Sequence, residues 1–448
     1  MDSCITFFTH RKTTLLVTLA LFLIAPGLAR ADLLEYVKKA DDSYSWKLKG
    51  KTENDLGTIY DLHLVSQTWQ NIKWEHQLQI YVPKGVKPTE TIVLWNQGGK
   101  SSPTSILFGM EMAKKASAPV AFLYGIPNQP LFGMDKKKGL TEDALIAETF
   151  VRYLGSKDES WPLLFPMVKS LVKAMDALQA FAQREWNFVV RFFLVSGASK
   201  RGWTTWLTGA ADPRVKAIAP LVIDTLNMQK QLPHQLKSYG RYSEMIDDYV
   251  KRDLVPTPKT ERAQKLWSMV DPWVYREKLT MPTMIINGAN DPYWTVDALN
   301  LYWDDLKSPR WVSYVPNAGH NLAQKNALGI PDPSRALGTL GAFARHQIHG
   351  TTMPKLSWKH DDHDGKPRLT VQADPMPKAA RLWVADADKR DFRKSTWKEH
   401  PATINKDSIV GSIEAPPGNY RVFYGEMEYS LDGLTYYLST QVRVLEKK

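Results

Sequence analysis

Cysteine is nearly absent from this sequence, and its absence limits what can hold the folded chain together. The single cysteine among 448 residues is Cys4, close to the first residue. A disulfide needs two cysteines, so the fold depends on its packed core, and a redox role is set aside. A chain of this length has room for a large core, and about two to three domains are ordinary at this size.

A long apolar run is also absent. The run Leu15–Ala25 is too short to span a bilayer, and it follows the basic residues Arg11 and Lys12. A small-x-small site then ends at Ala31, and this order is typical of a secretory signal. We expect cleavage after Ala31, which removes residues 1–31 and leaves a periplasmic or secreted protein with no membrane span. An uncleaved anchor is the weaker alternative.

The sequence has no glycine-rich phosphate loop and no nicotinamide or nucleotide fingerprint, so we expect no cofactor. Its 58 lysines and arginines exceed 47 acidic residues and give a net charge of +11, but they are scattered rather than gathered in a stripe. Nucleic acid is therefore not expected, whereas an anionic envelope surface is a possible partner. The segment KHDDHDG at 359–365 has metal-ligand composition without a distant ligand, which favours a hairpin turn and no metal site.

Apolar runs that resemble strands alternate with helical patterns through most of the chain. Strands are expected at 76–82, 91–95, 119–126, 191–196, 215–224, 282–287 and 311–316. Several are apolar throughout, as in a parallel sheet that is covered on both faces. Apolar residues at helical spacing predict a long helix over 161–186. The alternation predicts a doubly wound α/β domain.

Two segments depart from this alternation. Residues 226–279 are polar, helical in pattern and rich in aromatics, and they lie between two expected strands, as a lid would. From residue 354, short alternating runs are separated by HDG, PPGN and LDG turns, which is typical of a small β-sandwich. The sequence therefore predicts a signal at 1–31, an α/β domain at 32–353 with its lid, and a β-sandwich at 354–448.

A candidate nucleophile lies in the stretch VSGASKRGW, at an expected strand-to-helix turn. Ser199 follows Gly197 by two residues, the spacing by which hydrolases expose a nucleophilic serine. The small residue expected two positions after the serine is replaced by Arg201, and a glycine comes one later, at Gly202. The alternative is a serine that only caps the following helix.

A nucleophilic serine needs a base and an acid. Asp291 follows the strand at 282–287, and His320 follows the strand at 311–316. The chain order serine, acid, histidine is that of α/β-hydrolases, where histidine takes the serine proton and the acid orients the histidine. Asp224, also at a strand end, is the alternative acid. Without a catalytic role, Asp291 would only begin an Asp-Pro turn and His320 would be an ordinary surface histidine. The three residue types in this order favour a triad.

The oxyanion of such a reaction needs backbone N–H donors. Lys200, at the start of the expected helix, supplies one candidate. Gly98 and Gly99, in the loop after the strand at 91–95, supply the other, with a plain tight turn as the alternative. Glu142 and Glu148 would suit a substrate amine in a peptidase-type pocket, but a solvated helix face is expected for both.

Three blocks resemble the PhoPQ-activated pathogenicity-related protein family: SGASKRGWTTWLTGAADPRVKAIAPLVID, IINGANDPYWTVDALNLYWDDL and PNAGHNL. The resemblance extends over nearly all of the chain after residue 31. It implies an exported α/β-hydrolase fold with a C-terminal β domain, a Gram-negative source, and Ser199, Asp291 and His320 as the triad. The family is named for regulation and virulence, so the resemblance supplies no substrate.

These observations favour a serine hydrolase that cleaves an ester or amide bond of a small-molecule or peptide substrate. A peptidase-like activity is one variant of this hypothesis. A secreted binding or signalling protein, built on a hydrolase scaffold with an idle triad, is the alternative from another class. Two observations support that alternative: Arg201 replaces the small residue of the usual hydrolase motif, and the family is not named for any substrate.

Overall fold

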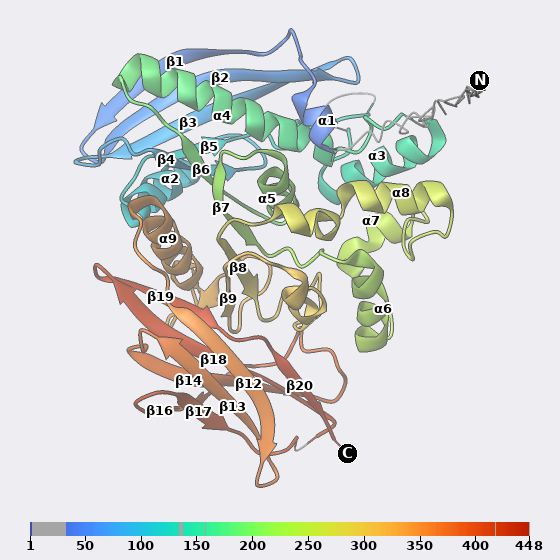
Figure 1. The fold of residues 1–448 in the computed structure, drawn as a ribbon, viewed down its shortest axis with the longest axis vertical. Helices are drawn as coiled ribbons and strands as arrows, with labels where there is room; N and C mark the ends of the chain where they lie inside the picture. The colour runs from blue at the N-terminus through green and yellow to red at the C-terminus, as the bar shows by residue number, and fades with distance from the viewer. Residues whose placement is uncertain (2–32, 134–137, 157, 417, 448) are drawn as a thin grey trace.

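The computed structural model of the protein describes residues 1, 33–133, 138–156, 158–416 and 418–447 (Figure 1). The expected cleavage site after Ala31 and the segment that precedes it, apart from Met1, lie outside the described residues. Within the described ranges, no helix combines the length and apolar character needed to cross a membrane.

One mixed sheet of fourteen strands runs through the molecule, in the order β1-β2-β3-β5-β4-β6-β7-β8-β9-β19-β18-β14-β15, with β20 paired to β18. The first three strands are antiparallel: β1 (Ser45–Asn54), β2 (Gly57–Trp69) and β3 (Ile72–Pro83). The six central strands are parallel: β4 (Thr91–Asn96), β5 (Val120–Leu123), β6 (Phe192–Ala198), β7 (Val215–Leu221), β8 (Thr283–Gly288) and β9 (Arg310–Val315). This is an α/β-hydrolase fold.

Helices cover both faces of the parallel strands, because alternate side chains of each strand are apolar on both sides. In β4, Ile92 and Leu94 pack into one core with α1 (Leu33–Lys38), α3 (Glu142–Ser156), α4 (Leu164–Trp186) and α5 (Lys200–Ala211). Val93 and Trp95 pack into a second core with α2 (Pro103–Ala116) and α9 (Ser334–His349). The expected helix at 161–186 begins three residues later, since Pro162 precedes it.

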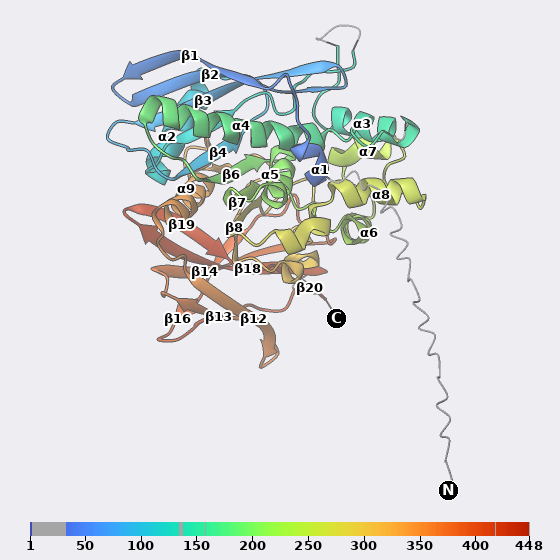
Figure 2. The same ribbon diagram turned by 45° about the horizontal axis from the view of Figure 1, so that its top comes forward.

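A helical insertion joins β7 to β8. It contains α6 (Met228–Tyr239), η1 (Glu244–Ile246), α7 (Asp247–Val250), α8 (Glu261–Val270) and η2 (Pro272–Lys278). Of these helices, α7 and α8 lie beside α3 at one end of the parallel strands, as Figure 2 shows, and η2 packs against α5. The N-cap Thr260 accepts a hydrogen bond from the Ala263 N–H and starts α8, whose apolar face is buried. The insertion therefore packs as part of the main core.

The C-terminal strands form two layers. One is a four-stranded sheet: β12 (Lys355–His363), β13 (Lys366–Asp374), β17 (Ile409–Ser412) and β16 (Thr403–Ile404). The facing layer contains β14 (Ala379–Ala387), β15 (Lys398–Pro401), β18 (Tyr420–Leu431), β19 (Leu434–Ser439) and β20 (Arg443–Glu446). Asp364 and Gly365 form the hairpin turn between β12 and β13, with positive φ angles of 51° and 74°.

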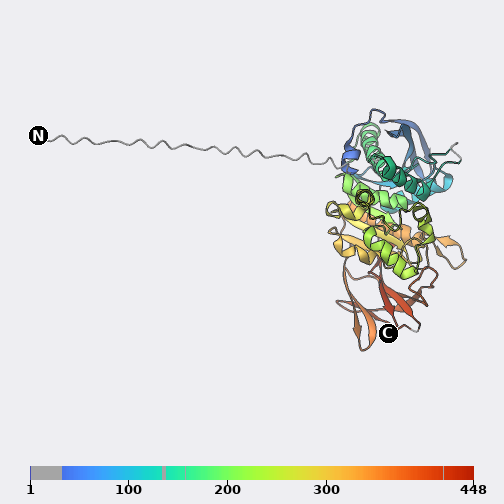
Figure 3. The same cartoon turned by 90° about the vertical axis from the view of Figure 1, so that its right-hand side faces the viewer.

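The facing layer of the C-terminal strands continues the central sheet. β19 pairs antiparallel with β9, and Ser439 lies opposite Val312. Figure 3 shows the N-terminal strands, the parallel strands and the C-terminal strands following one another along the molecule. The hydrolase half and the C-terminal half therefore share backbone hydrogen bonds as well as side-chain packing.

Candidate active site

Ser199 occupies the sharp turn between β6 and α5. Its φ and ψ angles are 59° and −126°, a strained conformation for a residue with a side chain. Its N–H donates to the Leu221 carbonyl at 2.9 Å, which fixes the turn against β7. Although Ser199 stands at the N-cap position of α5, its side chain makes no capping hydrogen bond. The geometry is that of a turn that exposes a serine hydroxyl rather than of a helix cap.

Two glycines let this turn pack closely against neighbouring strands. A Cβ atom on Gly197 would lie 2.4 Å from Nδ2 of Asn96 in β4. A Cβ atom on Gly202 would lie 2.5 Å from Cγ2 of Ile223, just after β7. Gly202, one position after the small residue of the usual motif, thus allows α5 to pack closely against the end of β7.

Arg201 projects away from the turn and binds the neighbouring loops. Its Nε donates to the Ile126 carbonyl at 2.6 Å, and its guanidinium lies against Gly98, where a Cβ atom would meet Nη2 at 1.9 Å. Nη1 and Nη2 donate to the two carboxylate oxygens of Glu142 at 2.6 and 2.5 Å. The departure from the usual motif therefore places an arginine that ties α5 to α3 and to the loops after β4 and β5.

The expectation that Glu142 lies on a solvated helix face is wrong. Burial opposes ionisation of this carboxyl, but the hydrogen bonds and charge of Arg201 outweigh burial and lower its pKa. Glu148 forms ion pairs with Arg152 at 2.8 Å and with Arg252 at 4.0 Å.

His320 and Asp291 lie together. Nδ1 of His320 is 2.8 Å from Oδ2 of Asp291, and Oδ1 of Asp291 accepts the Tyr293 N–H at 2.8 Å. With its Nδ1–H donated to the carboxylate, His320 presents Nε2 as an acceptor. That Nε2 atom is buried and has no hydrogen-bond partner among the described residues. Ser199 and His320 line the same cavity, and catalytic hydrogen bonds often form only when substrate binds.

Asp224 has other partners. Its carboxylate accepts hydrogen bonds from the Tyr302 hydroxyl at 2.5 Å and from Nδ2 of Asn287 at 2.8 Å. Burial raises the pKa of Asp224 to about 6. The structure therefore brings His320 to Asp291 and not to Asp224.

A polar cluster beside the site has no counterpart in the sequence analysis. Nζ of Lys200 lies 2.6 Å from Oδ2 of Asp143, and the hydroxyls of Tyr249 and Tyr293 donate to the same carboxylate at 3.1 and 3.2 Å. The Tyr293 ring packs on the His320 ring, with centroids 4.4 Å apart. Asp143 carried no local signal, because only the chain path of α3 brings it to Lys200.

The cavity beside Ser199 extends under the helical insertion. Its apolar and aromatic lining consists of Trp203, Val222, Ile223, Met228, Ile246, Tyr249, Val255, Trp267, Tyr293 and Trp294. The centre of a water molecule can reach only about 30 Å³ of it, so the cavity is narrow. Lys200 also lines it and is the first residue of α5, so its N–H has no acceptor within the helix.

The glycines expected as oxyanion donors, Gly98 and Gly99, are not among the residues that line this cavity. Gly98 contacts Arg201, whereas Gly99 lines a separate, more open cleft of about 430 Å³ with residues of β2 and β3. Across the described part of the chain, no group of three or more His, Cys, Asp or Glu side chains is arranged to hold a metal ion.

Comparison with known proteins establishes the family. The family described as PhoPQ-activated pathogenicity-related protein matches residues 33–393. The chain belongs to this family. It is also 32% identical to autocrine proliferation repressor protein A of Dictyostelium discoideum, over 93% of this chain and 89% of that protein.

Among solved structures, this family member is similar to an acetyl xylan esterase from Paenibacillus sp. R4, with 14% identity and a TM-score of 0.46 over 64% of this chain and 86% of that one. It is also similar to a glucuronoyl esterase from Solibacter usitatus, with 13% identity and a TM-score of 0.41 over 69% of this chain and 87% of that one. These two likenesses concern the fold alone.

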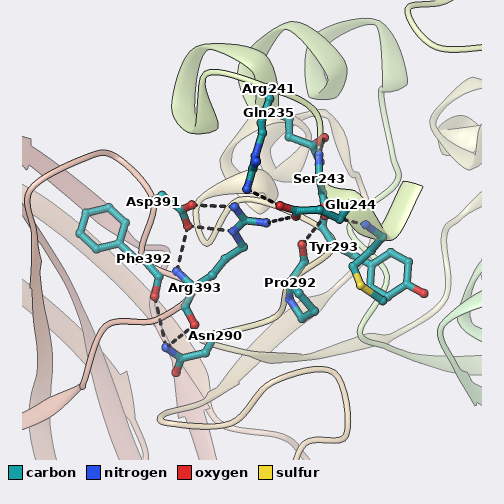
Figure 4. A network of polar contacts seen from close by, with 11 residues as sticks. Gln235, Arg241, Ser243, Glu244, Asn290, Pro292, Tyr293, Asp391, Phe392 and Arg393 are labelled. Atoms are coloured by element: carbon teal, nitrogen blue, oxygen red, sulfur yellow. Dashed lines mark hydrogen bonds and ion pairs between the residues drawn. The ribbon is translucent and has the colours of Figure 1, made fainter. Parts of the chain in front are cut away.

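In this family member, the loop at 388–397, between β14 and β15, contacts the loop that carries Asp291. Nδ2 of Asn290 donates to three carbonyls of that loop: those of Phe392 at 3.2 Å and Arg393 at 3.3 Å, which Figure 4 shows, and that of Ser395 at 2.8 Å. The residue next to the candidate acid is therefore held by the C-terminal half.

The same 388–397 loop contacts the segment before His320. Nδ2 of Asn317 donates to the Trp397 carbonyl at 2.9 Å, and the Trp397 N–H donates to Oδ1 of Asn317 at 2.8 Å. Both asparagines stand close to predicted site residues, but nothing in the local sequence indicates their distant partners.

Charged residues of this loop also reach the helical insertion. Nη1 of Arg393 lies 3.0 Å from Oε2 of Glu244, and its Nη2 pairs with Asp391 at 2.6 Å (Figure 4). Nη2 of Arg390 lies 2.5 Å from Oδ2 of Asp297, whose Oδ1 is 2.9 Å from Nε2 of His234. Burial opposes ionisation of Asp297, but His234 and Arg390 outweigh it and lower its pKa. The loop thus joins the insertion to the segment after Asp291.

Proposed function

We propose that this protein is a serine hydrolase that cleaves an ester or amide bond through Ser199, His320 and Asp291. The observation that carries the proposal is the arrangement of His320. Its Nδ1 lies 2.8 Å from Asp291, while its buried Nε2 is unpartnered among the described residues and shares a cavity with the strained Ser199. A histidine oriented by a carboxylate, with its other nitrogen available, is suited to general-base catalysis.

In this mechanism, Nε2 of His320 takes the proton from Oγ of Ser199 as the oxygen attacks the substrate carbonyl carbon. Asp291 stabilises the resulting imidazolium through Nδ1–H. The carbonyl oxygen gains negative charge next to the amino end of α5, where the Lys200 N–H is a donor. The imidazolium then protonates the leaving alcohol or amine, and water releases the acyl group from Ser199 by the same steps in reverse.

The charged groups near Ser199 favour an ester over an aminopeptidase substrate. A site for a substrate amine needs a carboxylate that is free to bind it. Glu142 is bound to Arg201 at 2.6 and 2.5 Å, and Asp143 is bound to Lys200 at 2.6 Å. Both carboxylates are therefore neutralised by residues of α5.

A second candidate function is signalling by a protein whose triad is idle. The relative from Dictyostelium discoideum is named for repression of proliferation, and the family is named for pathogenicity. Both functions are compatible with export by a signal at 1–31 and with a link to envelope stress or virulence. The two functions differ in whether Ser199 is chemically activated.

Labelling of the purified protein with a fluorophosphonate probe, read by intact mass, separates the two functions. A hydrolase gives one adduct on the wild type, and the adduct is lost in Ser199→Ala and in His320→Ala. His349→Ala is the matched control, because this histidine lies at the end of α9 and bonds to the Ala116 carbonyl. A folded wild type without an adduct would contradict the hydrolase proposal and favour the signalling function.

A further inference from the structure

We propose that the cavity beside Ser199 binds the acyl half of an ester, and that this acyl group is slim, apolar and ends in a hydrogen-bond acceptor. The inference rests on the proposed hydrolase function and adds the class of substrate. Four features of the cavity carry it: its walls, the state of its charged groups, two unpartnered polar atoms and its narrow shape.

The walls are apolar or aromatic, and they come from the sheet side of the cavity and from the helical insertion. Trp203 belongs to α5, Ile223 follows β7, and Met228 and Trp267 belong to the helical insertion. Burying an apolar acyl group against such walls is favourable, and more so with each added CH₂. A strongly hydrated group would lose its water there without compensation.

The charged groups that reach the cavity are already paired with each other. Lys200 and Asp143 form an ion pair, and the hydroxyls of Tyr249 and Tyr293 donate to the same carboxylate. The side chains of Lys200 and Asp143 are only 10% and 13% exposed. No charge in this cluster is left to bind a carboxylate or ammonium group of a substrate, so the acyl group is expected to be uncharged.

Besides Nε2 of His320, two buried polar atoms on residues that line the cavity have no partner among the described residues. These are the hydroxyl oxygen of Thr225, which is 3% exposed, and the indole Nε1 of Trp267, which is 5% exposed. Both residues line the cavity, one after β7 and the other on α8. A buried donor without a partner is unfavourable, and an acceptor on a ligand that reached it would recover that loss. The acyl group is therefore expected to carry an oxygen acceptor beyond its carbonyl.

The shape of the cavity indicates which half of the ester it holds. The centre of a water molecule reaches about 30 Å³, which suits a slim chain or a flat ring and not a bulky group. The acyl group stays bonded to Ser199 until water releases it, whereas the alcohol must leave after the first step. A narrow space under the insertion is thus better suited to the acyl half.

Three 4-nitrophenyl esters test this inference: acetate, 5-methylhexanoate and 5-oxohexanoate. The last two have chains of the same length and similar end size, and they differ by an acceptor oxygen. We expect kcat/KM for 5-oxohexanoate to exceed that for acetate at least tenfold and that for 5-methylhexanoate at least fivefold. A site built around a hydrogen bond discriminates strongly against the analogue that lacks it.

Thr225→Val removes one donor and keeps the shape of the side chain, whereas Trp267→Phe removes the other donor and also makes the ring system smaller, a change that its control has to match. In each variant, the ratio of the 5-oxo to the 5-methyl rate is expected to fall toward one. Thr295→Val and Trp206→Phe are matched controls, because their polar atoms are also buried and unpartnered among the described residues but neither residue lines the cavity. The controls are expected to keep the wild-type ratio.

The fluorophosphonate adduct, measured on the same preparation, distinguishes two kinds of failure. An adduct on Ser199 with the fastest rate on acetate, or with no 5-oxo preference, overturns the acyl-site inference and leaves the hydrolase proposal standing. A folded wild type without an adduct overturns the hydrolase proposal itself, and the acyl-site inference with it.

Discussion

Two carboxylates lie beyond the ends of β7 and β8, and their surroundings give them different chemistry. Asp291 accepts hydrogen bonds from His320 and from the Tyr293 N–H. Asp224 is buried, bonded to Tyr302 and Asn287, and has a pKa raised to about 6 by burial. The first is suited to orienting a histidine, whereas the second is suited to joining β7 and β8 to the segment that carries Tyr302.

Asp291→Asn is therefore expected to lower kcat on a 4-nitrophenyl ester by about 10³–10⁴-fold, because an amide no longer holds the histidine in the reactive tautomer. Asp224→Asn is the matched control, and we expect it to change kcat by less than about tenfold. Steady-state kinetics on both variants measures the difference. A larger loss in the Asp224 variant would assign the role of orienting acid to Asp224.

Asp224 also predicts a pH dependence of stability. Its pKa rises from 3.8 to about 6 on folding, so its contribution is largest below about pH 4 and is lost as pH rises through 6. Asparagine does not titrate. Wild type therefore loses stability over this range and the variant does not. The free energy of unfolding of Asp224→Asn minus that of wild type is expected to rise by roughly 2 kcal/mol between pH 4.5 and pH 7.5. Urea unfolding at the two pH values measures it, and an unchanged difference would show that Asp224 keeps its ordinary pKa in the fold.

Among the individual residues, the sequence indicated the positions of Ser199, Asp291 and His320, because each follows an apolar run that is typical of a strand. It did not indicate Asp143 or the role of Glu142. Their partners Lys200 and Arg201 lie on α5, far along the chain, and only the path of α3 over the sheet brings them together. Such contacts leave no periodic pattern in the sequence.

The 388–397 loop contacts several segments around the site. It bonds to Asn290 beside the candidate acid, to Asn317 before the histidine, and to Glu244 of the insertion. Three segments that must keep a fixed relation for catalysis are thus bound by one loop of the C-terminal half. Such a loop would affect the reaction rate by fixing the distances between the catalytic groups, without taking part in the reaction itself.

Asn290→Ala removes the side-chain amide that donates to three carbonyls of this loop. We expect about a tenfold slower fluorophosphonate labelling and faster amide hydrogen exchange at 388–397. Asn300→Ala is the matched control, since Nδ2 of Asn300 also donates to the C-terminal half, at the Val442 carbonyl, but away from the Ser199 cavity. Equal labelling rates in the two variants would show that the Asn290 contacts do not position Asp291.

The strands differed in how clearly the sequence showed them. The parallel strands were visible as apolar runs, and their observed bounds differ from the expected ones by only a few residues at most ends. β1 and β2 were not expected; in β1 most side chains are exposed, and apolar residues alternate with polar ones only at Trp46 and Leu48. The pairing of β19 with β9 could not be expected either, since strand partners distant in the chain are fixed by the whole fold.

At the scale of the whole molecule, a buried ion pair joins the two halves. Nη1 of Arg335, on α9, lies 2.7 Å from Oε2 of Glu426, on β18, and the Glu426 side chain is fully buried. Arg381 binds the other carboxylate oxygen of Glu426 at 3.2 Å. Burial raises the pKa of Glu426, while the two guanidinium groups oppose that shift.

Glu426→Ala leaves two largely buried arginines without this partner, and we expect it to lower the free energy of unfolding by about 3–5 kcal/mol. Glu428→Ala is the matched control on the same strand. Its carboxylate is partly exposed and, in the described part of the chain, forms an ion pair with Arg381 alone, at 2.8 Å, so a loss of about 1 kcal/mol or less is expected. Urea unfolding of both variants gives the comparison, and similar losses would mean that the Arg335 contact adds little to the joint between the halves.

The continuity of the sheet sets an order of events during synthesis. β9 is complete when residue 315 has been made, but its neighbour β19 begins only at residue 434. At about 5–20 residues per second, the ribosome needs on the order of ten seconds to make the chain between them. Throughout that interval β9 presents an open edge, to which another nascent chain can pair. The candidate active site is encoded in the middle of the chain, but the 388–397 loop that contacts its segments is made only later.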